Sequence, residues 1–270
     1  MSKKYDLGQG DLEGMALHRF QRKLFKYEKE SRFLTHERDR IQAREEVFDK
    51  NTLMNIYDLS RRGFISYLNG VVKAGKESRV YWGVKSDNSD VAVKIHLVSN
   101  AEFKKRMNYI AGDPRFTRIK KGMANLVNLW ANKEFKNLRS AYDNGIPVPE
   151  PITVKKNVVL MEFMGKNGVS SPLLAESEVK DSDYNRLIKL VAKLFSKSNL
   201  VHADLSEYNV FKSNGKLIML DFGSAVDISH PMAREFLRRD LYNINRFFIR
   251  RGVNVTETDD LMEMIMPNDF

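Results

Sequence analysis

The chain has 270 residues, 42% of them hydrophobic and 30% charged, which predicts one bilobed globular domain or two small ones. No apolar run approaches the roughly 20 residues that a membrane-spanning helix needs, and the N-terminus lacks the apolar core of a signal peptide, so no membrane partner is expected. The net charge is +10 and there is no cysteine, which excludes disulfides and thiolate metal sites and favours a reducing, cytoplasmic location.

The first 63 residues are predicted to form a helical extension. Residues 1–14 are polar, and residues 15–48 carry a weak helical stripe that indicates one or two helices. Asn51 and Thr52 are placed to cap a further helix, which ends near Gly63.

From Phe64 the pattern changes to short strands, predicted over residues 65–72, 79–85 and 91–98. The loop between the first two strands contains Gly75 and Lys76, and such a loop can lie over a triphosphate and offer backbone N–H groups and an ammonium group. It is neither a Walker A loop nor a G-x-G-x-x-G loop, and any hairpin with one glycine looks similar.

A lysine inside an apolar strand is the sharper signal. Lys94 lies in the strand of residues 91–98, where a lysine is costly unless it is paired. The sequence Val91-Ala92-Val93-Lys94 is similar to the kinase pattern V-A-I-K, in which such a lysine binds the nucleotide phosphates and pairs with a helix glutamate. A helix predicted over residues 126–142 places Glu134 one turn from Trp130 and beside the apolar face, which makes Glu134 the candidate partner of Lys94. The alternatives are an edge-strand lysine that faces water and a glutamate on a solvated helix face.

Most of the net positive charge lies between Lys94 and Ser140, where 11 Lys and Arg accompany 3 Asp and Glu, a local net charge of +8. Within this stretch, residues 99–122 are predicted to be a basic, flexible insertion, because several Gly, Asp and Pro residues interrupt regular structure. A basic patch attracts polyanions, of which nucleic acid is the commonest large one; the alternative is a solvated basic surface.

The second half of the chain alternates a connector, a strand and helices. Prolines between residues 147 and 151 predict an extended connector, followed by a buried strand over residues 157–163. Amphipathic helices are predicted over residues 182–197, 232–251 and 258–266.

Residues 202–223 hold three side chains that suit one reaction. Asp204 is placed to accept a proton from an attacking hydroxyl, while Asn209 and Asp221 offer the oxygen ligands that a hard cation such as Mg²⁺ prefers. Asn214-Gly215 lies between two apolar runs and predicts a hairpin that folds Asp221 back beside Asn209.

The sequence HADLSEYN followed by DFG resembles the protein-kinase catalytic loop H-x-D-L-x-x-x-N and its metal-binding D-F-G. Only 47 residues follow Gly223, so the longer activation segment and A-P-E motif of an ordinary kinase are not visible. The chain is more similar to the RIO family of atypical protein kinases, type-1 branch, from about residue 45 to 250. The supporting sequences are EEVFDKNTL, AGKESRVY, WANKEFKNL, MEFMG, HADLSEYN, and HP with EFLRRD.

This resemblance implies an α+β fold, a trimmed two-lobed kinase with an antiparallel-sheet N-lobe, a mainly helical C-lobe and an N-terminal helical extension. We therefore expect divisions at residues 1–63, 64–163 and 164–270. The resemblance also implies an ATP-dependent serine/threonine protein kinase that autophosphorylates, hydrolyses ATP and acts in small ribosomal subunit maturation. Its partners would be the subunit precursor or rRNA and protein substrates including itself, and its cofactors ATP and Mg²⁺, with Mn²⁺ as an alternative cation.

Residue roles follow from the same resemblance. Asp204 would be the catalytic base, and Asn209 and Asp221 would hold the cation, with Asp221 also a candidate for an aspartyl-phosphate. Lys94 would bind phosphates, and backbone groups of Glu162 and Met164 would bind adenine at the hinge between the lobes.

Three departures from the family pattern stand out. Ala203 replaces the usual glycine, which we expect to be harmless because alanine is small. Phe222-Gly223-Ser224 stands where the family commonly has Gln, and Lys73-Ala74 replaces the hydroxyl residues of the phosphate loop.

Two other functions are open. Small-molecule phosphotransferases of the aminoglycoside- or choline-kinase type share H-x-D and a downstream Asp, but usually add large C-terminal helices for which this chain has little room. A nucleotide-switched RNA- or ribosome-binding scaffold would not need the full set of catalytic side chains.

Overall fold

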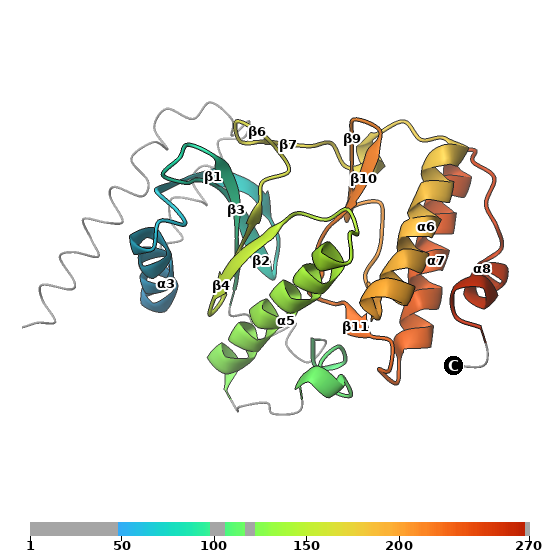
Figure 1. Cartoon of the computed structure of the whole chain (residues 1–270), viewed down its shortest axis with the longest axis horizontal. Helices are drawn as coiled ribbons and strands as arrows, with labels where there is room; N and C mark the ends of the chain where they lie inside the picture. Colours follow the sequence, from blue (N-terminus) through green and yellow to red (C-terminus); the bar gives the residue numbers. More distant parts are fainter. Residues whose placement is uncertain (1–47, 98–105, 117–121, 268–270) are drawn as a thin grey trace, which may run out of the picture.

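The computed structural model describes residues 48–97, 106–116 and 122–267 (Figure 1). The helices predicted before residue 48, and parts of the predicted insertion, lie outside the described residues. One lobe consists of a sheet with a helix beside it, and the other is mainly helical, as the resemblance implied (Figure 1). Among the described residues, no helix combines the length and the apolar character that crossing a bilayer requires.

The sheet lobe is a five-stranded antiparallel sheet in the order β1-β2-β3-β5-β4. Its strands are β1 (Tyr67–Ala74), β2 (Ser78–Val84), β3 (Asp90–His96), β4 (Pro151–Lys155) and β5 (Val158–Glu162). Side chains alternate along β3: Val91, Val93 and Ile95 pack in the core with α3 (Lys50–Arg61), while Lys94 faces the opposite side, toward the cavity. This alternation brings Lys94 to the helix that carries Glu134.

Two local features differ from the sequence prediction. The N-cap of α3 is Asp49, whose carboxylate accepts hydrogen bonds from the Asn51 and Thr52 amides, so the capping residue precedes the two we predicted. Part of the predicted connector forms β4, which lies at the sheet edge and begins with Pro151, a position where the missing N–H of proline is tolerated.

The long helix α5 (Met123–Asp143) contacts β4 and β5 and also lies against the helical lobe. The predicted insertion contributes residues 106–116, which end in a 3₁₀ turn, η2 (Pro114–Phe116). Ile110 and Phe116 from this segment pack against Leu126 and Trp130 of α5. These residues of the insertion are therefore folded against α5, although the whole stretch was predicted to be a flexible loop.

The helical lobe is built from α6 (Asp181–Ser198), α7 (Ala233–Arg250) and α8 (Thr258–Ile265), within two residues of the predicted bounds at each end. In Figure 1, α6 and α7 run side by side and α8 lies beyond them. Apolar side chains from α6 and α7 form one large core, with Leu187, Leu194, Leu241 and Phe248 among its most buried members. This core supports the loops that carry the predicted site.

Short strands frame those loops. The predicted hairpin is confirmed as β9 (Val210–Ser213) paired with β10 (Lys216–Met219). Two smaller pairs are β8 (Leu200–Val201) with β11 (Val226–Asp227), and β6 (Gly165–Lys166) with β7 (Val169–Ser170). A single 3₁₀ turn, η3 (Leu174–Glu176), precedes α6.

Candidate active site

A cavity of about 660 Å³ lies between the two lobes, within the size range of small-molecule sites. Strand β3, helix α5, the loop after β1, the segment after β5 and the loops around β8 to β10 all contribute to its lining. Seven of the eight predicted site residues line it: Lys76, Lys94, Glu134, Glu162, Met164, Asp204 and Asp221. The eighth, Asn209, is largely buried, and its amide nitrogen donates to the backbone oxygen of Asp204 at 2.8 Å.

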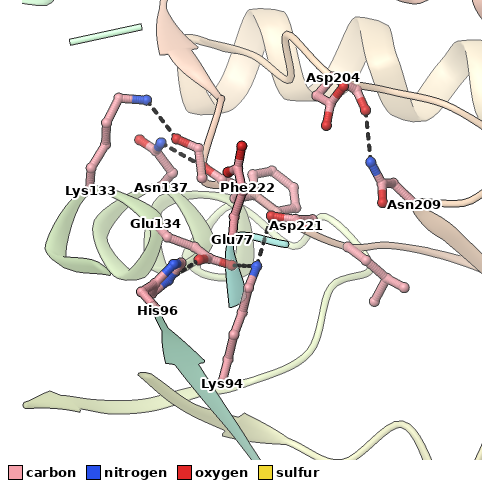
Figure 2. A network of polar contacts seen from close by, with 12 residues as sticks. Glu77, Lys94, His96, Lys133, Glu134, Asn137, Asp204, Asn209, Asp221 and Phe222 are labelled. Carbon is pink, nitrogen blue, oxygen red and sulfur yellow. Dashed lines mark hydrogen bonds and ion pairs between the residues drawn. The ribbon is translucent and has the colours of Figure 1, made fainter. Parts of the chain in front are cut away.

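Lys94 joins the two lobes through a pair of carboxylates (Figure 2). Its Nζ lies 2.6 Å from Glu134 Oε1 and 2.8 Å from Asp221 Oδ1. Burial acts to lower the pKa of Lys94, but the two carboxylates outweigh it and raise that pKa. Lys94 in turn outweighs burial at Asp221 and lowers the pKa of that carboxyl, so both groups are charged near neutral pH.

His96 is a neighbour of this pair that the sequence analysis missed. Its Nε2 lies 2.8 Å from Glu134 Oε2, and both side chains are buried. Burial lowers the pKa of His96, which favours the neutral imidazole. The two-residue spacing on β3 puts Lys94 and His96 on one face, so strand alternation was the signal that could have found it.

The backbone of the Asp204 loop is anchored from α7. The Asp240 carboxyl group accepts hydrogen bonds from the Ala203 amide at 2.7 Å and the Leu205 amide at 2.9 Å, and Arg239 donates to the Ala203 carbonyl oxygen. Burial raises the pKa of Asp240 to about 7, against the effect of the two amide donors. Asp240 and Arg239 were not predicted as site residues, because their partners lie in a distant loop.

Ala203 adopts a backbone φ of +62°, in the left-handed region that favours glycine. An L-residue there costs roughly 1–2 kcal/mol, which gives a physical reason for glycine at this position of the family pattern. The expectation that alanine is harmless considered only the size of the side chain and not this backbone conformation.

Asp204 lies in this anchored loop and faces the cavity. Burial is the main cause that raises its pKa, and the negative charge of Asp221 acts in the same direction. A carboxylate with a raised pKa accepts a proton more readily, which suits a general base.

The hairpin and His202 make contacts between the loop that carries Asp204 and the loop that carries Asp221. The Leu220 amide donates to the Asn209 carbonyl oxygen at 2.9 Å, so Asp221 follows directly beside Asn209, as the hairpin predicted. His202 Nε2 lies 2.8 Å from the Leu220 carbonyl oxygen, and its ring packs 5.0 Å from that of Phe222. Burial lowers the pKa of His202.

The residues predicted to contact the nucleotide, Lys76, Glu162 and Met164, also line the cavity. Lys76 is exposed in the loop after β1, where the Gly75 amide donates to the Ser78 carbonyl oxygen at 2.9 Å. The Glu162 amide donates to the Glu150 carbonyl oxygen, and the Met164 carbonyl oxygen accepts from the Ser171 amide, both at 2.8 Å. These two backbone groups are satisfied within the protein, and adenine binding by Glu162 and Met164 stays a prediction.

Comparison with known proteins decides the family. The sequence model described as "RIO domain" matches residues 79–261. The chain belongs to the RIO family. It is 36% identical over 237 residues to the RIO-type serine/threonine-protein kinase Rio1 of Haloferax volcanii, covering 87% of this chain and 81% of that relative. It is 35% identical over 227 residues to the serine/threonine-protein kinase RIO1 of Homo sapiens, covering 82% of this chain and 40% of that relative.

These relatives place this RIO chain in the RIO1 type of atypical serine/threonine kinases. It spans most of the archaeal relative but less than half of the human one. Among solved structures, the Rio2 kinase of Chaetomium thermophilum superimposes with a TM-score of 0.63 at 21% identity, covering 83% of this chain and 70% of that one. The Rio2 kinase–ADP/Mg²⁺–phosphoaspartate complex from the same organism gives 0.62 at 24%, covering 81% and 67%. This likeness confirms the two-lobed kinase fold.

Proposed function

We propose that this RIO chain transfers the γ-phosphoryl group of ATP to a serine or threonine hydroxyl of a protein, including its own. The observation that carries the proposal is the Lys94 ammonium group, which bridges Glu134 and Asp221 in the same cavity as Asp204. Phosphoryl transfer depends on positioning and on charge stabilisation, and this arrangement supplies both.

The proposed roles divide between the lobes. Lys94 binds the nucleotide phosphates, while Glu134 holds the ammonium group in place at 2.6 Å. Lys76 and the backbone N–H groups of its loop lie over the phosphates from the sheet lobe, and backbone groups of Glu162 and Met164 meet the adenine. The helical lobe contributes Asp204, Asn209 and Asp221.

The donor atoms in the helical lobe fit a hard cation. Asn209 uses its amide nitrogen on the Asp204 backbone, which leaves its amide oxygen for a ligand, and Asp221 engages Lys94 through one of its two carboxylate oxygens. Among the described residues, no group of three or more His, Cys, Asp or Glu side chains is arranged to hold a metal ion. The cation therefore fits here only together with phosphate oxygens and water, which is how Mg²⁺ usually binds in kinases.

The chemical step uses Asp204 as the base. The substrate hydroxyl oxygen forms a bond to the γ-phosphorus as the bond from that phosphorus to the β,γ-bridging oxygen breaks, and ADP leaves. The hydroxyl proton passes to the Asp204 carboxylate, whose raised pKa favours its acceptance. Mg²⁺, when bound, supplies neutralisation of the phosphate charge.

Two finer activities remain proposals for this chain. ATP hydrolysis would replace the substrate hydroxyl by water, and an aspartyl-phosphate would form if the Asp221 carboxylate accepted the phosphoryl group. The Rio2 kinase structure with a phosphoaspartate supports the second as a candidate, because its fold is the same.

The proposed partner is the precursor of the small ribosomal subunit or its RNA, in the cytoplasm. The support is the excess of Lys and Arg between residues 94 and 140, because RNA phosphates attract such a surface. Of the basic residues in the insertion, Arg106 is paired with Glu77 and Arg115 with Asp113, so RNA contacts are expected from the others. An affinity for ribosomal RNA that does not change with salt concentration would argue against this partner.

The test of the proposed function follows γ-labelled phosphate from Mg-ATP with the purified chain alone and with a generic basic protein added. We expect label on serine or threonine, a fall in rate of roughly 10²–10⁴-fold in Asp204→Ala, and little change in ATP affinity. Unchanged turnover in Asp204→Ala would contradict the assignment of the base.

Other outcomes favour the alternatives. Free phosphate, or acyl-phosphate label that Asp221→Asn abolishes, would indicate an ATPase-like switch. Label that passes only to an added aminoglycoside or choline would indicate a small-molecule phosphotransferase. Nucleotide binding without turnover in any sample would indicate a scaffold.

A further inference from the structure

A fully buried lysine lies next to Glu134 on α5. Lys133 has a relative exposure of 0%, and its Nζ donates to the Gly223 carbonyl oxygen at 3.0 Å and also to that of Ala225. One turn later, Asn137 Nδ2 donates to the carbonyl oxygens of Phe222 at 2.9 Å and Ala225 at 2.7 Å. Two side chains of one helix thus bind three carbonyl groups directly after Asp221.

Figure 2 shows that neighbouring side chains of α5 have different partners. Lys133 and Asn137 reach the backbone of the segment after Asp221, while Glu134 meets Lys94. Lys94 also binds the Asp221 carboxylate. Helix α5 therefore contacts the Asp221 side chain indirectly, through Glu134 and Lys94, and holds the backbone that follows Asp221 through Lys133 and Asn137.

Burial of a lysine side chain is energetically unfavourable. Burial lowers the pKa of Lys133 to about 7; the nearby Asp113 and Glu134 act against this effect, and Arg115 acts with it. An uncharged amine still has two N–H donors, so both carbonyl contacts persist in either protonation state. An apolar residue would fill the same space without this cost but would leave the carbonyl groups unpaired.

The loop that Lys133 and Asn137 hold is conformationally demanding. Asp221 has a φ of +61°, in the left-handed region, and such backbone persists only when surrounding contacts determine it. At Gly223, an added Cβ would lie 2.9 Å from the Trp130 ring nitrogen, so the loop lies tightly against α5.

The orientation of the Asn137 amide is fixed from a third direction. Arg115 Nη1 donates to Asn137 Oδ1 at 2.9 Å, which turns the amide nitrogen toward the two carbonyl oxygens. Arg115 is itself held by the Asp113 carboxylate at 2.6 and 2.9 Å. The folded part of the insertion therefore supports the contact.

We propose that Lys133 and Asn137 are positioning residues for Asp221, and that they set the direction in which its carboxylate meets a divalent cation. This rests on the proposed function, which assigns Asp221 to the cation. The backbone contacts act through Asp221 and not on the nucleotide, so their loss alters the response to Mg²⁺ more than the binding of nucleotide by itself.

The experiment uses Lys133→Met, which keeps an unbranched apolar side chain one atom shorter and loses the amino group, and Asn137→Asp, which keeps the acceptor for Arg115 but loses the donors. Lys136→Met is the matched control, because Lys136 is an exposed lysine on the same helix. Binding of a fluorescent ATP analogue is measured in EDTA and across a Mg²⁺ titration, and the Mg²⁺ concentration that half-saturates phosphoryl transfer is measured in parallel. Urea unfolding monitors the fold of each variant.

We expect both variants to need roughly 10–100-fold more Mg²⁺ than wild type, the size of effect seen when groups that orient a metal ligand are removed. Nucleotide affinity in EDTA should stay within about twofold of wild type, and Lys136→Met should match wild type in every measurement. If Lys133→Met does not fold, Asn137→Asp decides.

Wild-type Mg²⁺ dependence in both variants would overturn the proposal, and so would an equal loss of nucleotide affinity with and without Mg²⁺, because that would indicate a general structural role. If wild type transfers no phosphate, the proposed function fails. The positioning role is then decided by the Mg²⁺ dependence of analogue binding, which does not require turnover.

Discussion

The loop that carries Asp204 and the loop that carries Asp221 face one cavity, but different parts of the molecule hold them. Asp240 and Arg239 anchor the first loop from α7, within the helical lobe. Lys133 and Asn137 anchor the second from α5, the helix that packs on the sheet and carries Glu134.

Each loop contains a residue with left-handed backbone, Ala203 at φ +62° and Asp221 at φ +61°. In the first loop a buried carboxyl group accepts from backbone amides, and in the second a buried amine and an amide group donate to backbone carbonyls. The Asp204 loop is therefore fixed when the helical lobe folds, whereas the Asp221 loop also depends on how α5 docks. We therefore expect substitutions in α7 to affect mainly the Asp204 loop and substitutions in α5 to affect mainly the Asp221 loop.

The largest expected effect is the loss of folding stability when the anchor of the Asp204 loop is removed. Asp240→Leu keeps a buried side chain but leaves the Ala203 and Leu205 amides without their acceptor, which we expect to cost roughly 2–6 kcal/mol of folding stability. Urea unfolding measures this cost. Asp143→Leu, which alters an exposed acid at the end of α5, is the control and should change stability by less than about 0.5 kcal/mol. Equal stability of the two variants would contradict the anchoring role.

The two anchors should also respond to pH in opposite directions. Asp240 has a folded pKa raised to about 7, so the stability that it contributes in its protonated form is lost as pH rises from about 4 through 7. Lys133 has a folded pKa lowered to about 7, so stability is gained as pH rises from 7 toward its unfolded value near 10.5. Each slope is at most about 1.4 kcal/mol per pH unit.

This prediction is measured as the difference in unfolding free energy between wild type and Asp240→Asn, and between wild type and Lys133→Met, at a series of pH values. The first difference should shrink with rising pH between 4 and 7, and the second should grow between 7 and 10. If the difference in unfolding free energy between wild type and Asp240→Asn did not change with pH, the two amide donors would keep Asp240 ionised in the folded protein.

The smallest expected effect concerns the strained alanine. Ala203→Gly removes the left-handed penalty but adds freedom to the unfolded chain, so we expect a gain of up to about 1 kcal/mol in stability. Ala192→Gly, in the middle of α6, is the matched control and should lose roughly 0.5–1 kcal/mol. Thermal unfolding compares the two, and a loss of equal size in both would show that Ala203 is not strained.

The main helices and the hairpin before Asp221 followed from local patterns in the sequence. Apolar periodicity placed α6, α7 and α8 within two residues, and the Asn-Gly turn gave the hairpin that sets Asp221 beside Asn209. The pair of Lys94 and Glu134 was predicted from a lysine in an apolar strand, where it is costly unless paired, together with the similarity to a kinase pattern that joins such a lysine to a helix glutamate.

Tertiary structure alone decided which backbone groups the buried polar side chains satisfy. Lys133 reads locally as one more charged residue on a helix, yet its acceptors lie 90 and 92 residues away, and those of Asn137 lie 85 and 88 residues away. The role of Asp240 and the folding of residues 106–116 against α5 were not predicted for the same reason. Periodicity reports which face of an element is apolar, but the partner of a buried polar group is set by the packing of segments distant in the chain.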